Sequence, residues 1–456
     1  MQMKYRRIIF YIFLALFLIS VPFILLYATG YRYNSKKNKF EKTGGLVVNT
    51  IIKNASLFVN GRAYGTGQEF RIQDLLPGEY EIKIRKSGYF DWQKKLSVES
   101  QITTFAKDVR LIADNLPAKA VDASAGLIYP APDQSKFLYL KKEKDKNSIF
   151  VFDTANDAEK SIALLPPRQT IKNISWSPNN EKIILETPSG FQVINASDGK
   201  VQALPLKIKI FGLRWDETNS SQLFAAATDG VYKIDLLFGK AEKIYPTSPR
   251  LPTSLSELRG TSRGAGSPEK IADDFAVLGN YLYLVNQSML QQINLNSGEV
   301  ISLPLERNGY KIRLAEGKRL VMIDGKQHLQ IFALPLQKLS TPEVFADAKN
   351  FDIFGNNLLY YNDFELWTHN FGSGEKELIT RFGEEIKKAR WLSGSNYVAV
   401  SFNNQIKIIE LDKRDSRQIY DFPKFEQIGD FIVNKQSSLY FTGKVNAASG
   451  IYKLEL

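Results

Sequence analysis

The sequence contains no cysteine and only two histidines, His328 and His369, among its 456 residues. Without cysteine the chain has no disulfide, no thiolate metal site and no cysteine nucleophile. Two histidines are too few for a histidine-rich metal centre, and general-base catalysis by histidine is not expected. Asp-rich calcium loops and glycine-rich phosphate loops are also missing. The sequence therefore predicts no metal site, no cofactor and no catalytic residues, and favours a protein that is not an enzyme.

One catalytic pattern is present by letter, at Gly260-Thr261-Ser262-Arg263-Gly264, which fits the G-x-S-x-G nucleophile elbow. That chemistry needs a strand before the serine, a helix after it and a histidine downstream. Here the pattern lies in residues 246–270, a stretch rich in Pro, Ser, Gly and Thr with few large apolar residues. Such a composition predicts a surface loop or a disordered insert and no nucleophile.

Charge is biased to one sign, with 60 Lys and Arg against 48 Asp and Glu, a net charge of +12. A basic balance favours anionic partners such as lipid headgroups, acidic wall polymers or nucleic acid. No dense run of Lys and Arg stands out, so ordinary solvated lysines remain the alternative interpretation. Nucleic acid is disfavoured because most of the aromatic residues alternate inside predicted strands, away from the surface where bases would stack.

A single long apolar run exists, from Ile8 to Ala28, and it contains no charged residue. At about 1.5 Å per residue it is long enough to cross the roughly 30 Å hydrocarbon core of a bilayer once. It is longer than a cleavable signal core, and no clean small-x-small cleavage site lies after it. We therefore expect a cytoplasmic tail and transmembrane anchor over residues 1–29, which contacts the bilayer through residues 8–28, and a linker over 30–43.

The orientation of this anchor is not settled by counting charges. The short N-terminal tail carries Lys4, Arg6 and Arg7, which favours retention of the tail inside and export of the domains after the span. Basic residues also lie just after the span, however, and these would place the C-terminal side in the cytoplasm. They are Arg32, Lys36, Lys37, Lys39 and Lys42, opposed only by Glu41. We expect a cell-membrane protein with extracytoplasmic C-terminal domains, and a cytoplasmic sensor remains the alternative.

Residues 44–112 predict a small all-β sandwich of about six short strands. Apolar residues alternate with charged ones through Tyr80, Ile82 and Ile84, which indicates one buried and one exposed face. Asn60-Gly61 predicts a two-residue hairpin of type I′. Residues 76–79 (Leu-Pro-Gly-Glu) predict a second turn, with proline fixing φ and glycine in the left-handed position.

Separated turns and aromatic residues in this unit resemble the PEGA domain. The resemblance rests on Pro77, Gly78, Glu79, Tyr80, Gly88, Tyr89 and Trp92, together with the upstream Val59-Asn60-Gly61. It implies a sandwich outside the cytoplasmic membrane of a bacterium. For the motif residues themselves we expect structural roles, in turns and in the core.

The remainder, residues 120–456, repeats a pattern of apolar strands separated by polar hairpins. Trp176, Trp215 and Trp391 occupy equivalent positions before a turn, and the first two are about one blade length of 40–45 residues apart. About eight repeats can be read, each too small to bury its own apolar face. They resemble TolB-like and WD-repeat units, which implies a β-propeller of seven or eight blades.

Together these features predict an all-β protein with one N-terminal transmembrane helix, a PEGA-like sandwich and a seven- or eight-bladed propeller. We expect a membrane-anchored binding or scaffold protein whose propeller recognises an envelope protein, a peptide or an anionic cell-wall polymer. One alternative is a propeller hydrolase or lyase that uses carboxylates at the central mouth. Acidic side chains converging at one end of the channel without basic neighbours would distinguish that enzyme from a binding protein.

Overall fold

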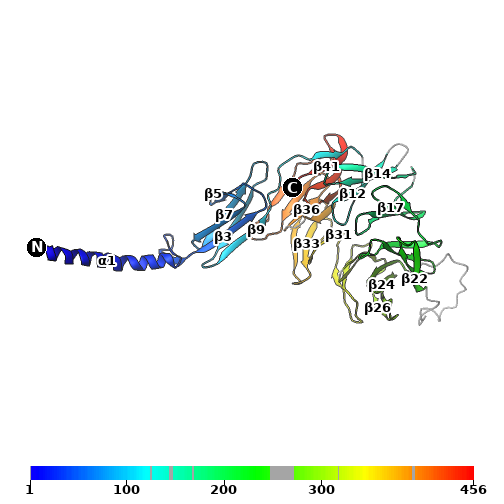
Figure 1. The fold of residues 1–456 in the computed structure, drawn as a ribbon, viewed down its shortest axis with the longest axis horizontal. Helices are drawn as coiled ribbons and strands as arrows, with labels where there is room; N and C mark the ends of the chain where they lie inside the picture. The colour runs from blue at the N-terminus through cyan, green and yellow to red at the C-terminus, as the bar shows by residue number, and fades with distance from the viewer. Residues whose placement is uncertain are drawn as a thin grey trace.

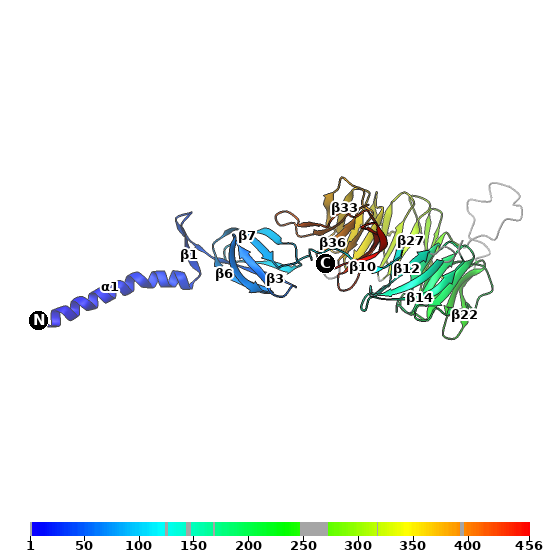
Figure 2. The same ribbon diagram turned by 90° about the horizontal axis from the view of Figure 1, so that it is seen from above.

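A computed structural model describes residues 2–123, 126–142, 147–166, 169–246, 272–316, 318–392 and 396–456. These residues form a long helix, a hairpin, a β-sandwich and a series of four-stranded sheets. Figures 1 and 2 show these parts in a row, with the helix at one end and the four-stranded sheets at the other. The sandwich therefore separates the helix from the larger body.

Helix α1 (Gln2–Ala28) contains the apolar run, and its part Tyr5–Ala28 is long and apolar enough to cross a membrane. Its large apolar side chains are exposed along its length rather than packed against protein. Exposed apolar surface of this extent is unfavourable in water and favourable in hydrocarbon. The helix fits a single-pass membrane anchor or a signal sequence.

A hairpin and a two-layer sandwich come after α1. The hairpin pairs β1 (Tyr31–Asn34) with β2 (Lys39–Lys42). One layer of the sandwich has the order β6-β3-β9 and the other β5-β4-β7-β8. Their strands are β3 (Gly44–Thr50), β4 (Ala55–Val59), β5 (Arg62–Gly67), β6 (Glu69–Leu75), β7 (Gly78–Arg85), β8 (Trp92–Val98) and β9 (Thr103–Val109). The described sandwich thus has seven strands, close to the six or so that the apolar pattern predicts.

The two predicted turns of the sandwich differ in outcome. Asn60 and Gly61 have φ of 47° and 76°, as a type I′ turn requires, so this prediction is confirmed. Gly78 is not in the left-handed region, and that prediction is wrong. Strand β7 already begins at Gly78 with extended backbone, and the left-handed residue of this connection is Asp74, at φ 60°.

Beyond the sandwich the described chain forms eight four-stranded antiparallel sheets, here called blades 1 to 8. Blade 1 contains β11 (Ile128–Pro130), β12 (Lys136–Lys142), β13 (Asn147–Asp153) and β14 (Ala158–Leu165), and blade 2 contains β15 (Asn173–Trp176), β16 (Lys182–Thr187), β17 (Gly190–Asn195) and β18 (Val201–Gln202). Blade 3 contains β19 (Ile210–Trp215), β20 (Gln222–Ala227), β21 (Gly230–Asp235) and β22 (Lys240–Pro246). Blade 4 contains β23 (Asp274–Leu278), β24 (Tyr281–Asn286), β25 (Met289–Asn294) and β26 (Val300–Pro304).

Blades 5 to 7 continue the series with the same order of strands. Blade 5 contains β27 (Lys311–Glu316), β28 (Arg319–Ile323), β29 (Leu329–Ala333) and β30 (Glu343–Phe345). Blade 6 contains β31 (Asn350–Phe354), β32 (Asn357–Tyr361), β33 (Glu365–Asn370) and β34 (Lys376–Arg381). Blade 7 contains β35 (Lys388–Trp391), β36 (Tyr397–Ser401), β37 (Ile406–Glu410) and β38 (Ile419–Asp421). Each sheet alone is too thin to bury its apolar faces, so stacking against a neighbour is what stabilises it.

Blade 8 is composite, because β10 (Ala118–Val121) pairs with the last three strands of the chain in the order β10-β41-β40-β39. Those strands are β39 (Gln427–Val433), β40 (Leu439–Val445) and β41 (Ala448–Leu454). Blade 1 is a complete sheet by itself, and β10, the strand upstream of it, is the one that joins the end of the chain.

Apolar clusters lie between successive blades. Ile183 and Leu185 of blade 2 pack with Leu138 of blade 1, and buried side chains of blade 8 pack with Phe137 and Phe152 of blade 1. Comparable clusters join blades 2 to 3, 3 to 4, 4 to 5, 5 to 6, 6 to 7 and 7 to 8. The repeat, the strand order and this stacking confirm a β-propeller architecture.

Candidate functional site

The inner strands of neighbouring blades contact each other at several places, including β19 with β23, β31 with β35 and β11 with β39. A cavity of about 500 Å³ lies among the inner strands β11, β15, β31, β35 and β39 of blades 1, 2, 6, 7 and 8. The polar and aromatic side chains that line it are Tyr129, Trp176, Asp352, Lys388, Arg390 and Trp391. A concave site with converging charged and aromatic groups is the usual form of a ligand pocket.

Three aspartates on inner strands form hydrogen bonds with the inner strand of the next blade. Asp274, Asp352 and Asp430 stand at equal intervals in the sequence, on the inner strands β23, β31 and β39 of blades 4, 6 and 8. Each carboxylate accepts a hydrogen bond from a backbone N–H in the next blade. The donors are Ile312 to Asp274 at 2.9 Å, Trp391 to Asp352 at 2.9 Å and Ile128 to Asp430 at 3.1 Å. The aspartates thus fix the register between neighbouring inner strands.

Each of these aspartates also has a basic partner. Arg214 lies 2.9 Å from Asp274, Arg390 lies 2.8 Å from Asp352, and Lys388 lies 2.6 Å from Asp430. Burial lowers the pKa of Lys388 against the attraction of Asp430. For Arg390 burial acts in the same direction, but the charge of Asp352 outweighs it and raises the pKa of the guanidinium.

The three predicted blade tryptophans also bridge neighbouring blades. Each indole N–H donates to a backbone carbonyl on the first strand of the preceding blade. The pairs are Trp176 to Tyr129 at 3.0 Å, Trp215 to Ser175 at 3.2 Å and Trp391 to Asp352 at 3.3 Å. Trp176 and Trp391 in addition line the central cavity, whereas Trp215 does not.

The predicted motif residues of the sandwich occupy turns, strands and the core. The Tyr80 hydroxyl donates to the Leu76 carbonyl at 2.9 Å, and burial raises the pKa of Tyr80. Gly88 has φ of 81° and accepts a hydrogen bond from Asp114 through its carbonyl. Tyr89 packs against the sandwich core, and Trp92 lies within it. Pro77 precedes β7, in which Gly78, Glu79 and Tyr80 lie.

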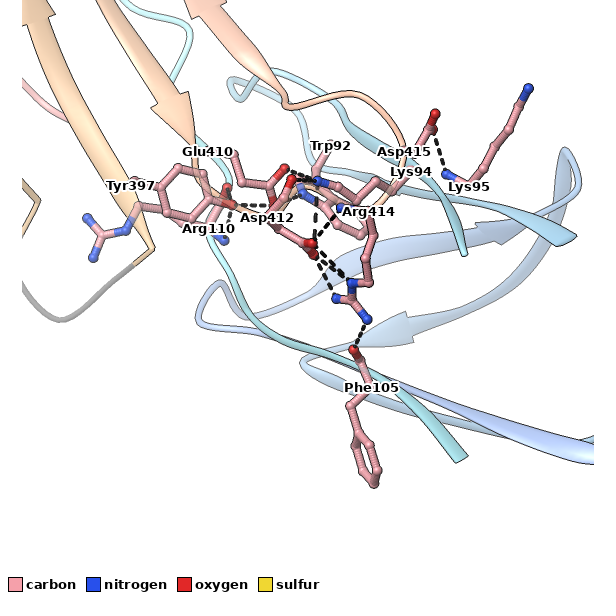
Figure 3. Close-up of polar contacts among 10 residues, drawn as sticks. All are labelled: Trp92, Lys94, Lys95, Phe105, Arg110, Tyr397, Glu410, Asp412, Arg414 and Asp415. Carbon is pink, nitrogen blue, oxygen red and sulfur yellow. Dashed lines mark hydrogen bonds and ion pairs between the residues drawn. The ribbon is translucent and has the colours of Figure 1, made fainter. Parts of the chain in front are cut away.

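Trp92 also takes part in the junction between the sandwich and blade 7, shown in Figure 3. The Glu410 carboxylate accepts hydrogen bonds from the Trp92 indole at 2.9 Å and from the Lys94 ammonium at 2.6 Å. The Lys94 side chain is 0% exposed and that of Glu410 is 5% exposed. Lys94 also donates to the Asp412 carbonyl at 2.7 Å, so a fully buried cation is satisfied from two sides.

Exposed contacts surround this buried pair. The Lys95 backbone N–H donates to Asp415, and Arg414 donates to the Phe105 carbonyl at 2.7 Å. Arg414 also binds Asp412. Burial alone would raise the pKa of that carboxyl, but the hydrogen bonds from Arg414 keep it below its usual range. The loop after β37 therefore holds both layers of the sandwich to the propeller (Figure 3).

Neither histidine lies in a metal site. His328 pairs with Asp324 at 3.2 Å and His369 with Glu343 at 2.7 Å. The described ranges contain no group of three or more residues that could hold a metal ion. The pattern Gly260 to Gly264, and the predicted insert from residue 247 onward, lie outside the described residues.

Sequence reasoning missed the aspartates and the junction. The equal spacing of Asp274, Asp352 and Asp430 was a readable signal once the repeat was known. Lys94 also left a signal, because strict alternation along β8 places it on the buried face with Trp92 and Leu96. A lysine at a buried position of an alternating strand predicts a buried acidic partner, but nothing in one sequence identifies Glu410 as that partner.

Comparison with known proteins gives one family match. Residues 43–111 match the PEGA domain family, which confirms the resemblance inferred from the turns and aromatic residues. No curated protein sequence matches the chain.

Solved structures similar to this chain include several repeat proteins. The β-propeller domain of Myceliophteria thermophila Cps50 (Swd1) has 13% identity and a TM-score of 0.46, covering 68% of this chain and 100% of that one. Saccharomyces cerevisiae Sqt1 has 11% identity and a TM-score of 0.47, covering 76% and 99%. BamB from Moraxella catarrhalis has 10% identity and a TM-score of 0.44, covering 76% and 98%.

Proposed function

We propose that this chain is a membrane-anchored binding or scaffold protein whose propeller, outside the cytoplasmic membrane, recognises an envelope protein, a peptide or a cell-wall polymer. The observation that carries the proposal is the state of the inner-strand carboxylates. Asp274, Asp352 and Asp430 each have a basic partner and a backbone donor. A general acid or base must reach a substrate with a free oxygen, whereas these carboxylates are bound by basic side chains and by backbone N–H groups of the next blade. The arrangement therefore favours binding over the hydrolase or lyase alternative.

The lining of the central cavity favours an anionic ligand. Lys388 and Arg390 line it together with Asp352 and the indoles of Trp176 and Trp391, and each cation pairs with one aspartate, Lys388 with Asp430 and Arg390 with Asp352. The Arg390 side chain is 37% exposed, which leaves part of it accessible to a ligand while its guanidinium donates to Asp352 at 2.8 Å. Cationic groups next to aromatic faces suit acidic chains whose remaining surface is apolar. An anionic wall polymer or an acidic peptide meets both requirements.

Binding is tested with the full chain in nanodiscs of uncharged lipid, using polyglycerol phosphate and polyglutamate as probes. We expect affinity for at least one probe, and we expect it to fall with rising salt because surface charges are screened. Arg390→Gln should weaken this binding about tenfold, a value within the range of one desolvated charged contact. Arg381→Gln removes an exposed arginine on β34 and should leave affinity unchanged.

Absence of salt-dependent binding to both probes, or an equal loss in both variants, would contradict the proposal. Circular dichroism of Arg390→Gln shows whether the fold is intact, since Asp352 keeps its backbone donor in this variant.

The extracytoplasmic location is tested separately, with reporters fused after Leu456 that are active on only one side of the bacterial cytoplasmic membrane. We expect activity outside. Activity inside would contradict the envelope partner and favour the cytoplasmic sensor, the alternative that the basic residues after the span support.

A further inference from the structure

The hairpin formed by β1 and β2 folds back against the membrane helix. The Phe40 ring of β2 lies 6.5 Å from the Phe23 ring of α1, and Tyr33 lies 5.4 Å from Phe40 on the facing strand. Tyr33 and Phe40 are directly paired in the register of the hairpin, so both rings lie on one face. Figure 2 shows β1 beside the C-terminal end of α1.

This contact fixes how deep the hairpin reaches. Phe23 stands five residues before Ala28, the last residue of α1. At 1.5 Å per residue it lies roughly 7.5 Å back from the end of the helix. The side chain of Phe40 therefore reaches the level of the apolar run. Amphipathic elements that rest on bilayers bury their apolar faces to about 5–10 Å, which is the same depth.

The aromatic face of the hairpin is uncovered in the described part of the molecule. Tyr33 is 54% exposed and Phe40 is 43% exposed. Aromatic side chains are enriched where a protein meets the boundary between headgroups and acyl chains. Basic residues accompany them, namely Arg32, Lys36, Lys37, Lys39 and Lys42. Apolar rings and cations on one short element match the chemistry of an anionic membrane surface.

Arg32 holds the hairpin in this position. Its guanidinium lies 3.6 Å from the centre of the Tyr27 ring, donates to the Tyr27 carbonyl at 2.9 Å and pairs with Asp74 of the sandwich at 2.9 Å. One side chain thus connects the membrane helix, the hairpin and the sandwich.

The turn of the hairpin is also internally fixed. Asn34 accepts hydrogen bonds from the backbone N–H groups of Lys36 and Lys37 and donates to Glu41 at 2.7 Å. Glu41 is the one acidic residue of the hairpin, and it also pairs with Lys37 and Lys39. Its charge is compensated inside the hairpin, so the element as a whole stays basic.

We propose that the β1–β2 hairpin is a second membrane contact, which inserts Tyr33 and Phe40 at the headgroup boundary and binds anionic lipid through its lysines. The occupant of this face is a bilayer rather than a protein, because the face continues the surface of the membrane helix and carries the opposite charge to anionic headgroups. The proposal needs the anchor but not the ligand of the propeller, so it stands or fails apart from the proposed function.

Insertion is tested with the full chain carrying Phe40→Trp, reconstituted in phosphatidylcholine vesicles with 30% phosphatidylglycerol, about the anionic content that gives a strong surface potential. Bromine on the upper acyl chain should quench the fluorescence of the introduced indole about twofold, since that is the depth at which interfacial residues lie. The unsubstituted chain supplies the background of its five tryptophans.

Phe238→Trp is the matched control, because Phe238 is 75% exposed on the propeller. Its indole should not be quenched. Equal quenching in the two variants, or none in either, would overturn the insertion of the hairpin.

Lipid selection is tested by energy transfer from the same indole to dansyl-labelled phosphatidylglycerol or phosphatidylcholine. We expect more transfer to the anionic lipid. Changing Lys36, Lys37 and Lys39 to Gln should make the transfer to phosphatidylglycerol equal to the transfer to phosphatidylcholine. Salt at roughly 1 M should have the same effect, because the screening length is then about 3 Å. The control changes three exposed propeller lysines, Lys413, Lys424 and Lys435, to Gln. The role of the lysines would be overturned if Phe40→Trp alone transferred equally to both lipids. It would also be overturned if the preference for the anionic lipid persisted after the three hairpin lysines were changed.

Discussion

The sandwich is joined at one end to the propeller and at the other to the membrane helix, and the two junctions are built differently. Toward the propeller, Lys94 and Glu410 form a buried ion pair, and the Trp92 indole N–H donates to the same carboxylate. Toward the membrane, Arg32 and Asp74 form a more open pair, in which the Arg32 side chain is 21% exposed and that of Asp74 is 55% exposed. A buried pair depends on its particular neighbours, whereas an exposed pair exchanges easily with water.

The comparison indicates that contacts within the protein fix how the sandwich is oriented relative to the propeller, but not how it is oriented relative to the membrane. Phe90 of the sandwich packs on Tyr420 and Phe422 of blade 7, adding apolar contact to the buried pair. The hairpin junction has uncovered rings and several solvated lysines instead. We infer that the sandwich and the propeller move as one unit, while the angle between that unit and the membrane depends on the bilayer itself.

Breaking the buried junction should have the largest effect. Lys94→Met leaves Glu410 buried without its cation and should destabilise the protein by about 3–5 kcal/mol. Urea unfolding of the full chain in detergent, followed by fluorescence, measures this as a lower midpoint. Lys95→Met, the exposed neighbour on β8, should not move the midpoint. Adding Glu410→Leu to Lys94→Met should restore part of the loss, and no recovery would argue against the pair as its cause.

Removing the hydrogen-bond donor of Trp92 should have an intermediate effect. Trp92→Phe deletes a hydrogen bond to a buried carboxylate, a loss of roughly 1.5–3 kcal/mol, and the smaller ring leaves a cavity at this fully buried position that adds to the loss. The same unfolding measurement applies. A double-mutant cycle with Glu410→Gln should show coupling between the two positions, and additive effects would mean that the contact contributes little.

The exposed junction should respond weakly to the equivalent change. Arg32→Ala should alter stability by about 0–1 kcal/mol, as is usual for a solvated pair. Hydrogen exchange of the hairpin amides should nonetheless accelerate, because Arg32 also binds the Tyr27 carbonyl. A loss as large as that of Lys94→Met would contradict the difference between the junctions.

The smallest effect concerns pH. Hydrogen bonds from Asn34 and Lys39 lower the pKa of Glu41 to about 2. Because the folded pKa is depressed, the contribution of Glu41 is complete above its unfolded pKa of 4.5 and is lost as the pH falls toward 2. Titration of the Glu41 carboxyl by NMR checks the midpoint, and a value near 4.5 would contradict it. The hairpin amides should exchange faster only in this acidic window.

How much the sequence could predict depends on whether a signal was local. The apolar run to Ala28, the Asn60-Gly61 turn and the blade tryptophans are each read from short stretches, and the structure contains the helix, the turn and the blades. Gly78 was misread because a glycine after proline favours a left-handed residue only when the turn is tight. Here only Leu76 and Pro77 separate β6 from β7, and the left-handed residue is Asp74, near the end of β6.

The junctions could not be predicted because their contacts are distant in the chain. Lys94 and Glu410 are 316 residues apart in the sequence, and Phe40 meets Phe23 only because the hairpin turns back. The buried phase of Lys94 on β8 indicates that a partner exists. The identity of that partner depends on tertiary packing, and the periodic patterns of one sequence do not show which distant residues come into contact.

The composite blade has a consequence for how the protein is made. Strand β10 is synthesised near the beginning of the chain, yet Ala118 pairs with Lys453 almost at its end. At roughly 5–20 residues per second the strand waits on the order of 15–70 s for its partners. During this delay its free edge is open to incorrect pairing. Secure assembly of this protein is therefore a matter of timing, and a host that delays the C-terminus prolongs the vulnerable period.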